Sequence, residues 1–374
     1  MRILLFDNHI NGPLNFRKDL IESLRLKTYE VVVSVPYCKE VQKLNDLGFT
    51  YWQIDYSRHS QNPLAEIFTI FKFINAIVNV KPDIVLSYSI KPNIYGGVAC
   101  RLTKIPQIIN ITGMGDAVEN SSSTFIIIKA LYRIALKKVS HVFFQNNTNM
   151  TFCVKEFRAP LRKSSLLPGS GVNLLIHRLE NYPIARKNIQ FLFIGRIQRD
   201  KGVSEYINAA RIIHSRYKDV TFDIVGFFED KSFKALIEDF QKSKAGEYLG
   251  ISDNIHNVIG HYHAVVLPSY HEGMANVLLE AAACGRPVLA SNIPGCRETF
   301  DEGISGFGFE PRSVDSLVQS IERFIALPHE QKAAMGLAGR KKMEREFDRQ
   351  IVVDAYMREI ENILEENNKK DKKK

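Results

Sequence analysis

The sequence predicts an α/β protein with two Rossmann-like domains, each a doubly wound parallel sheet, facing each other across a cleft. Short apolar runs rich in β-branched and aromatic residues alternate with helical patterns from the first residue onward. The small-residue segment 168–173 interrupts this alternation once, and the pattern then resumes. A chain of 374 residues, 45% of them hydrophobic, is long enough to bury two cores.

The first half alternates strands and helices almost regularly. Strands are expected at 2–7, 31–36, 50–55, 83–89, 107–112, 141–145 and 164–168. Helices are expected at 14–26, 38–47, 64–80, 92–103 and 124–138. Parallel neighbours need crossover connections, so this order predicts right-handed βαβ units and a sheet covered on both faces.

The second half repeats the pattern after a hinge at Pro168–Asn173. Its strands are expected at 189–195, 222–227, 247–250, 264–269 and 286–291. Its helices are expected at 201–217, 231–242, 254–260 and 275–284, with further helices through the C-terminus. We therefore predict domains at 1–168 and 169–347, a helix at 348–366 that packs back across the first domain, and a disordered basic tail at 367–374.

The net charge of +9 is distributed unevenly. Residues 1–172 carry 21 Lys and Arg against 12 Asp and Glu, whereas the remainder carries 29 of each. We therefore expect an anionic partner on the N-terminal domain, either a phosphorylated substrate or an acidic membrane surface. A nucleic acid is not expected, because the aromatic residues are not interleaved with the basic ones as in a base-stacking platform.

The five cysteines are scattered without a CxxC pair, which argues against a disulfide framework and against a zinc site. We expect no metal and no cofactor. No apolar run approaches the roughly 20 residues that cross a bilayer, and the chain enters a strand at once without a signal-peptide pattern. The expected location is the cytoplasm.

The segment from His271 to Glu280 places two glutamates eight positions apart. Glu272 lies in the loop that follows a predicted strand, and Glu280 faces outward from the second turn of the helix that begins near Asn276. The first N–H groups of a helix and its dipole favour an anion such as a diphosphate, while carboxylates accept hydrogen bonds from hydroxyls. This arrangement suits a nucleotide sugar, although exposed glutamates near helix starts are also common without a ligand.

A second strand–loop–helix junction carries Gly195, Arg196 and Lys201. A guanidinium can hold two phosphate oxygens and a lysine adds a point charge, so the pair suits a departing diphosphate. Taken alone, the two side chains could equally be solvated loop cations.

The order GRxxxxKG, EGxxN and E-x7-E resembles the retaining family 4 glycosyltransferases of the GT-B fold. The resemblance implies that Arg196 and Lys201 bind the donor diphosphate, that Glu272 contacts the transferred sugar and that Glu280 holds the ribose. It implies a donor-binding loop whose backbone approaches sugar and phosphate, formed by Gly273, Met274, Ala275 and Asn276, with Gly195 on the facing loop.

Stretches at 89–102, 110–120 and 166–173 look like bacterial enzymes of exopolysaccharide, capsule and lipid-linked glycan assembly. This resemblance implies a UDP-sugar donor, a glycan acceptor on undecaprenyl diphosphate, and a peripheral position at the inner face of the cell membrane. The chain departs from the family in two places, since the double-glycine loop after the first strand is reduced to Asn11-Gly12-Pro13, and a frequent histidine is replaced near Thr112. The acceptor-side candidates are Gly12, Arg17, Gly113 and Gly115.

The sequence contains no DxD motif, which many glycosyltransferases use to bind a metal. Arg196, Lys201 and the helix N-terminus would then stabilise the leaving group, and we expect a metal-independent, front-face reaction. The predicted helix 124–138 places Lys129, Arg133 and Lys137 on one face, which suits either an acidic membrane surface or a solvated stripe on a core-packed helix.

Two other functions stay open. A nucleotide-sugar epimerase would also use paired Rossmann-like domains, and a non-catalytic, membrane-docked subunit of a glycan-assembly complex would share the charge pattern. A nucleic-acid-binding protein is a weaker third alternative.

Overall fold

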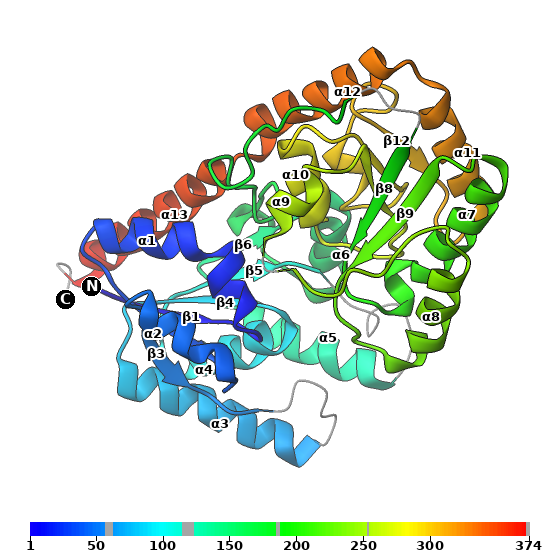
Figure 1. The fold of residues 1–374 in the computed structure, drawn as a ribbon. Helices are drawn as coiled ribbons and strands as arrows, with labels where there is room; N and C mark the ends of the chain where they lie inside the picture. Colours follow the sequence, from blue (N-terminus) through cyan, green and yellow to red (C-terminus); the bar gives the residue numbers. More distant parts are fainter. Residues whose placement is uncertain (57–62, 114–122, 185–187, 253, 372–374) are drawn as a thin grey trace. The chain divides into compact units, whose positions relative to one another are not determined.

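The computed structural model describes residues 1–56, 63–113, 123–184, 188–252 and 254–371. The chain divides into two compact units (Figure 1). Unit 1 comprises Met1–Ser170 and Gln350–Lys374, and unit 2 comprises Gly171–Arg349. The chain first passes from unit 1 to unit 2 after Ser170, a point referred to below as the crossing. It falls inside the predicted hinge, two residues after the predicted boundary at 168.

Unit 1 contains one parallel sheet, with the strand order β3-β2-β1-β4-β5-β6-β7 among the described residues. Its strands are β1 (Arg2–Phe6), β2 (Glu30–Val35), β3 (Thr50–Gln53), β4 (Ile84–Tyr88), β5 (Gln107–Ile111), β6 (His141–Phe144) and β7 (Ser164–Leu166). Its helices are α1 (Lys18–Leu26), α2 (Gln42–Asp46), α3 (Pro63–Val80), α4 (Gly97–Thr103), α5 (Ser123–Leu136) and α6 (Asn147–Phe157). Single π-helical turns precede α1 (η1, Gly12–Phe16) and α4 (η3, Pro92–Gly96).

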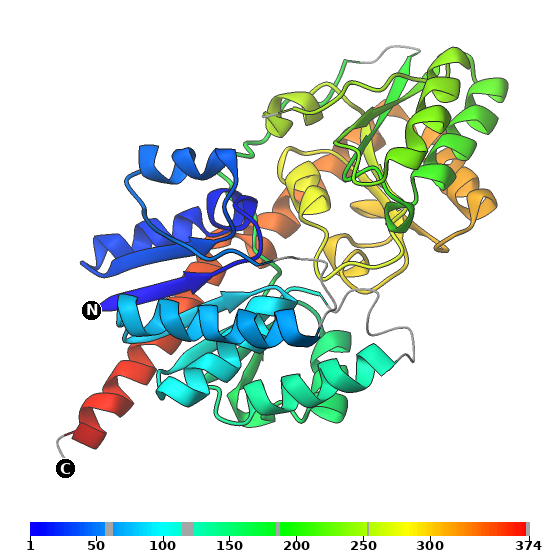
Figure 2. The same cartoon turned by 90° about the horizontal axis from the view of Figure 1, so that it is seen from below.

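Side chains of β1 alternate between the two faces of this sheet. Ile3 and Leu5 pack into one core with residues of α1 and α13 (Arg349–Asp371). Leu4 and Phe6 pack into a second core with residues of α3, α4, α5 and α6. The sheet is thus covered on both faces, as predicted (Figures 1 and 2).

The C-terminal helix α13 packs on unit 1 through Val352, Val353, Tyr356 and Ile360. The side-chain amide of Asn110 on β5 also donates a hydrogen bond of 2.8 Å to the hydroxyl of Tyr356. The prediction of a disordered tail at 367–374 is wrong as far as Asp371, because α13 continues to that residue; residues 372–374 lie outside the described part.

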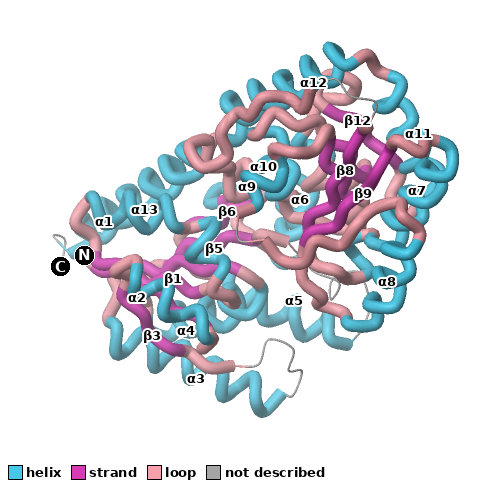
Figure 3. Tube along the Cα trace, viewed as in Figure 1, coloured by secondary structure: helices cyan, strands magenta, loops and turns pink. Residues whose placement is uncertain are grey.

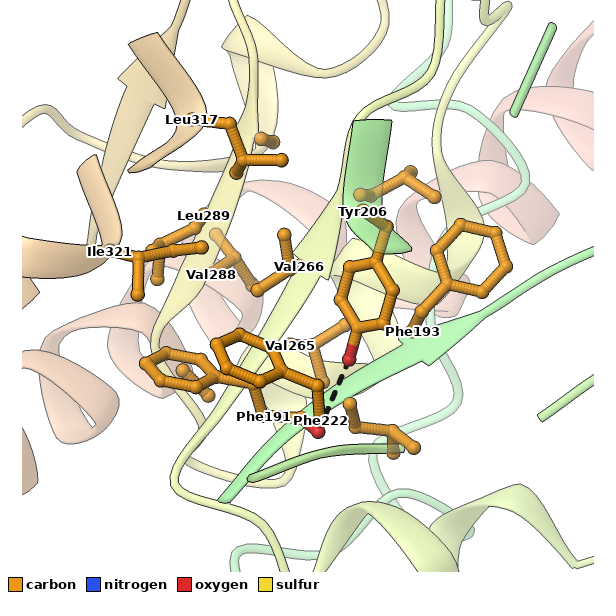
Figure 4. Packing of buried hydrophobic residues seen from close by; sticks show 14 of the residues in the cluster. Phe191, Phe193, Tyr206, Phe222, Val265, Val266, Val288, Leu289, Leu317 and Ile321 are labelled. Carbon is orange, nitrogen blue, oxygen red and sulfur yellow. Dashed lines mark hydrogen bonds between the residues drawn. The ribbon is translucent and has the colours of Figure 1, made fainter. Parts of the chain in front are cut away.

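Unit 2 contains a second parallel sheet, with the order β12-β11-β10-β8-β9 (Figure 3). Its strands are β8 (Ile189–Ile194), β9 (Val220–Val225), β10 (Ala264–Leu267), β11 (Val288–Ser291) and β12 (Gly306–Phe309). Its helices are α7 (Val203–Arg216), α8 (Lys234–Lys242), α9 (Ile255–Ile259), α10 (Asn276–Ala283), α11 (Val314–Ala326) and α12 (His329–Lys342). The hydrophobic core of unit 2 lies between this sheet and these helices (Figure 4). Within it, the hydroxyl of the buried Tyr206 donates a hydrogen bond of 3.3 Å to the carbonyl of Phe191.

Two strand predictions in unit 2 were wrong. Residues 247–250 form no strand, because only Tyr248 makes an isolated bridge, to Ile224. The strand β12 was not expected, because its sequence GFGF lacks β-branched residues. A Cβ on Gly306 would lie 2.2 Å from the carbonyl oxygen of Val288, so the close approach of β11 selects glycine over a typical strand residue.

Candidate active site

The candidate site residues of the C-terminal half of the chain lie where the strand order of unit 2 reverses. The chain passes from β8 to β9 on one side and then crosses to β10 on the other side of β8. Ligands of open α/β sheets bind beyond the carboxyl ends of the strands at such a reversal. Gly195 and Arg196 follow β8 directly, and Glu272 lies five residues beyond the end of β10.

Lys201 and Glu272 form the centre of this site. The Lys201 Nζ lies 2.5 Å from Oε1 of Glu272, and the two side chains are only 13% and 14% exposed. The hydroxyl of Ser269 donates a 2.8 Å hydrogen bond to the same carboxylate oxygen. One positive and one negative group, 71 positions apart in the sequence, are therefore held in contact at the edge of the sheet.

Gly202 allows the loop that carries Lys201 to approach β10. This residue ends the short turn Arg199–Lys201 and begins α7 with a φ of +67°. A Cβ at this position would lie 2.0 Å from the carbonyl oxygen of Pro268, which follows β10. Any other residue would be strained and would push Lys201 away from Glu272.

The helix α10 presents an open N-terminus beside this pair. It begins at Asn276 with Ala275 as the N-cap residue, and no side chain accepts a hydrogen bond from its first turn. The amide oxygen of Asn276 is buried without a hydrogen-bond partner among the described residues. No side chain in the described part of the chain caps the first turn, and its N–H groups and dipole favour a bound anion.

Gly295 supports the loop that leads into α10. The N–H of Ala275 donates to the Gly295 carbonyl at 2.8 Å. Gly295 has a φ of +84°, and a Cβ there would lie 2.7 Å from the carbonyl oxygens of both Glu272 and Gly273. Gly295 therefore holds the backbone of the predicted donor-binding loop in place. The side chain of Met274 is buried in an apolar cluster, so it does not line a ligand surface here.

Glu280 is partly buried rather than facing outward as the helical pattern predicted. Burial raises the pKa of Glu280 to about 7, an effect opposed by the positive charge of Arg349. Arg349 in turn donates through Nε to the carbonyl of Gly171 at 3.1 Å.

Arg196 is the most open of the predicted site residues. Its side chain is 47% exposed and makes a loose ion pair with Glu229, at 3.8 Å. The structure thus brings Lys201 and Glu272 together but leaves Arg196 on the surface, where a ligand can reach it.

Comparison with known proteins agrees with this geometry. The family "Glycosyl transferases group 1" matches residues 179–342, and the family "Glycosyl transferase 4-like" matches residues 2–146. The chain is a glycosyltransferase with the GT-B fold. A Rickettsia africae glycosyltransferase has the same fold, with a TM-score of 0.80 at 19% identity over 97% of this chain and 98% of that one.

Two relatives of this glycosyltransferase have names that include a diphospho-undecaprenol. An N,N'-diacetylbacillosaminyl-diphospho-undecaprenol α-1,3-N-acetylgalactosaminyltransferase from Campylobacter jejuni is 26% identical over 96% of this chain and 98% of its own length. A UDP-Gal:α-D-GlcNAc-diphosphoundecaprenol α-1,3-galactosyltransferase from Escherichia coli is 29% identical over 65% of this chain and 66% of its own. The predicted GT-B fold of two Rossmann-like domains and the predicted glycosyl transfer are confirmed.

The glycosyltransferase has a second polar cluster where the strand order of unit 1 reverses, between β1 and β4. Asp7 follows β1, and the hydroxyl of Ser89, which follows β4, donates to its carboxylate at 3.4 Å. Burial raises the pKa of Asp7, and the positive charge of Arg17 opposes this shift. A Cβ on Gly12 would lie 2.0 Å from the Asp7 carboxylate, so this acceptor-side candidate is a glycine that makes room for a buried acid.

Arg17 lies beneath that edge rather than on it. The side chain donates to the hydroxyl of Ser170 at 2.9 Å and stacks on the ring of Tyr88 at 4.2 Å, and the residue is 4% exposed. The guanidinium of Arg17 thus contacts both β4, where the strand order of unit 1 reverses, and Ser170, the last residue before the crossing. Gly113 follows β5, and Gly115 lies outside the described residues.

Sequence analysis missed three residues of these two sites. Ser269 could have been found from its place at the end of a predicted strand, because such positions point into the ligand crevice. Asp7 had the same signal at the end of the first strand. Nothing in the local sequence shows that Gly295 lies under Glu272, because that contact is made by tertiary packing.

Proposed function

We propose that this glycosyltransferase moves a sugar from a UDP-sugar to a glycan carried on a polyprenyl diphosphate, in the assembly of a bacterial surface glycan. The observation that carries the proposal is the Lys201–Glu272 pair beside the open N-terminus of α10. A cation and helix N–H groups suit a diphosphate, and a carboxylate suits sugar hydroxyls. The names of both relatives include a diphospho-undecaprenol acceptor, and one names UDP-Gal as the donor.

In the proposed reaction, the bond between the anomeric carbon and the diphosphate breaks while a bond to the acceptor oxygen forms on the same face. The departing diphosphate takes the proton of the acceptor hydroxyl, and the sugar keeps its anomeric configuration. Arg196, Lys201 and the α10 N-terminus stabilise the negative charge that grows on the leaving group, without a metal. Glu272 orients the sugar through its hydroxyls, and Glu280 holds the ribose.

The charge of unit 1 supports an anionic acceptor. With α13 included, this unit carries 27 Lys and Arg against 18 Asp and Glu, which is the whole net charge of +9. Several of these cations line a hollow of about 760 Å³ at the amino-terminal edge of the sheet, beside the first residues of β5 and β6. The cations are Arg101, Lys104, Lys138, Arg162, Lys163 and Lys369, and three acids, Glu359, Glu365 and Glu366, also line the hollow.

We further propose a peripheral position at the inner face of the cell membrane. Among the described residues, no helix is both long and apolar enough to span a bilayer. On α5, Lys129 pairs with Glu156 at 2.6 Å and Arg133 donates to the Glu156 carbonyl, so two of the three cations of the predicted basic stripe are engaged within unit 1. The same helix exposes Ile126 and Ile127, at 70% and 56%, which suits insertion into a lipid interface.

One experiment tests the transfer reaction. The purified chain is incubated with a panel of UDP-sugars, with and without a synthetic polyprenyl-diphosphate-linked sugar, and the products are analysed by mass spectrometry and NMR. We expect a new glycosidic bond only when both substrates are present, an unchanged anomeric configuration, and activity that persists in EDTA. A rearranged UDP-sugar formed without acceptor would instead show an epimerase.

A second experiment tests the membrane position. Vesicles with anionic lipid should co-sediment with the protein, and replacing Ile126 and Ile127 with Asp should weaken this several-fold. Equal co-sedimentation of the variant and the wild type would contradict docking through α5.

A further inference from the structure

Three side chains with metal-binding atoms meet in unit 2, at the C-terminal end of α10. His177 lies in the segment that follows the crossing from unit 1, His256 lies on α9, and Cys284 ends α10. One donor atom from each residue lies within 4.8 Å of the other two. The His256 Nδ1 and the Cys284 Sγ are 3.3 Å apart.

We propose that His177, His256 and Cys284 form a zinc site. Imidazole nitrogen and thiolate sulfur are the ligands that Zn²⁺ prefers, and a His₂Cys set leaves the fourth tetrahedral position for water. Tetrahedral bonds of about 2.0–2.1 Å to nitrogen and about 2.3 Å to sulfur place the ligand atoms about 3.4–3.6 Å apart. The His256–Cys284 pair already has nearly this separation, and atoms as far as 4.8 Å apart would have to move about 1 Å closer by side-chain rotation.

The hydrogen bonds around the cluster fit a metal site. The Nε2 of His256 lies 2.9 Å from a carboxylate oxygen of Glu180, so its proton is held there and the lone pair of Nδ1 faces the sulfur. Histidine ligands of metals almost always donate their other ring N–H to such a carboxylate or to a carbonyl. The Nδ1 of His177 is buried without a hydrogen-bond partner among the described residues, and a histidine that binds an ion leaves no such nitrogen unexplained.

Zinc binding would replace the proton of the Cys284 thiol, which passes to solvent as the sulfur–zinc bond forms. The thiolate and the Glu180 carboxylate together balance the charge of the ion. Burial raises the pKa of the Cys284 thiol to about 12, and the positive charges of Arg286 and Arg340 oppose this shift.

The ion would fasten the segment that follows the crossing to the C-terminal end of α10, whose other end opens on the donor site. The proposed role is therefore structural and independent of the transfer reaction. The sequence argument against zinc considered only local spacing, whereas these ligands come from three segments that only the fold brings together.

The test uses the full-length chain without an affinity tag, stripped with a chelator and dialysed. Titration with Co²⁺ should give a thiolate-to-cobalt charge-transfer band, and competing Zn²⁺ should abolish it at about one ion per chain. Zn²⁺ should raise the melting temperature by several degrees. Cys284→Ser should lose the band and the shift, whereas Cys153→Ser, at a buried cysteine of unit 1, should keep both.

Two further variants keep the proposal testable if Cys284→Ser does not fold. His177→Gln changes a partly buried side chain and should weaken the Co²⁺ affinity. Glu180→Gln removes the carboxylate partner of His256 and should weaken the Co²⁺ affinity about 10–100-fold. The absence of a thiolate band in the wild type, or an equal affinity in all variants, would overturn the proposal. Loss of glycosyl transfer in EDTA that Mg²⁺ restores, with an unchanged cobalt band, would count against metal-independent catalysis and leave the zinc site standing.

Discussion

Replacing Glu280 with Gln is expected to stabilise unit 2 at alkaline pH while weakening nucleotide binding. The carboxyl group of Glu280 is surrounded by protein, which raises its pKa to about 7 from an ordinary value of 4.5. Because the folded protein holds this proton more tightly than the unfolded chain does, the contribution of Glu280 to stability is greatest below pH 4.5 and is lost as the pH rises through 7. Glutamine has nearly the same shape and never ionises.

The size of the effect follows from the shift. A rise from 4.5 to about 7 corresponds to at most about 3 kcal/mol of lost stability above pH 8, at 1.36 kcal/mol for each pKa unit. The side chain is partly exposed, so we expect about 2 kcal/mol, which is about 4–8 °C in the melting temperature of a domain of this size. If the carboxylate binds ribose hydroxyls, the affinity for UDP should fall roughly 10–100-fold.

The assay is the melting temperature of the wild type and of Glu280→Gln, measured without ligand at intervals from pH 5 to pH 8.5, together with calorimetric titration of UDP. The exposed Glu330 on α12 provides the control variant, Glu330→Gln, which should follow the wild type at every pH. A difference between Glu280→Gln and wild type that does not grow with pH would refute the burial argument. An unchanged UDP affinity would refute the ribose assignment.

Other substitutions test the remaining parts of both sites. Arg196→Ala and Lys201→Ala should each lower turnover about 10²–10³-fold with little change in the circular dichroism spectrum, as expected for lost contacts to the leaving group; full activity would contradict their role. Glu272→Gln should reduce turnover yet bind free UDP roughly fivefold more tightly, because Lys201 is no longer neutralised; weaker UDP binding in a titration would speak against this. Gly202→Ala should cost about 3 kcal/mol in a denaturant titration, from its left-handed backbone and the carbonyl that its Cβ would meet, unless the loop can shift freely. Asp7→Ala should destabilise unit 1 by about 3 kcal/mol, since the buried guanidinium beside it loses its counter-charge; an unchanged melting curve would show that the pair is not coupled.

Local patterns in the sequence predicted the two parallel sheets and the loops that carry Arg196, Lys201 and Glu272. These features depend on strand and helix periods and on short motifs, all of which lie within a few residues of one another. The strand β12 was missed because the close approach of β11, a tertiary contact, selects glycine there. The partial burial of Glu280 could not be predicted for the same reason, because Arg349 reaches it from the far end of unit 2.

The contact between Lys201 and Glu272 explains how the site can hold opposite charges without a ligand. Both side chains are largely buried, and each would pay a desolvation cost if left alone, so in the free protein they satisfy each other. A donor brings a diphosphate for the lysine and hydroxyls for the carboxylate, and the proposed binding therefore exchanges one internal ion pair for two contacts to the ligand. A ligand that supplies only the diphosphate leaves the carboxylate with Ser269 alone, whereas the complete sugar nucleotide satisfies both groups. The proposed roles of Lys201 and Glu272 therefore favour the intact donor over the nucleotide product, which would assist product release after transfer.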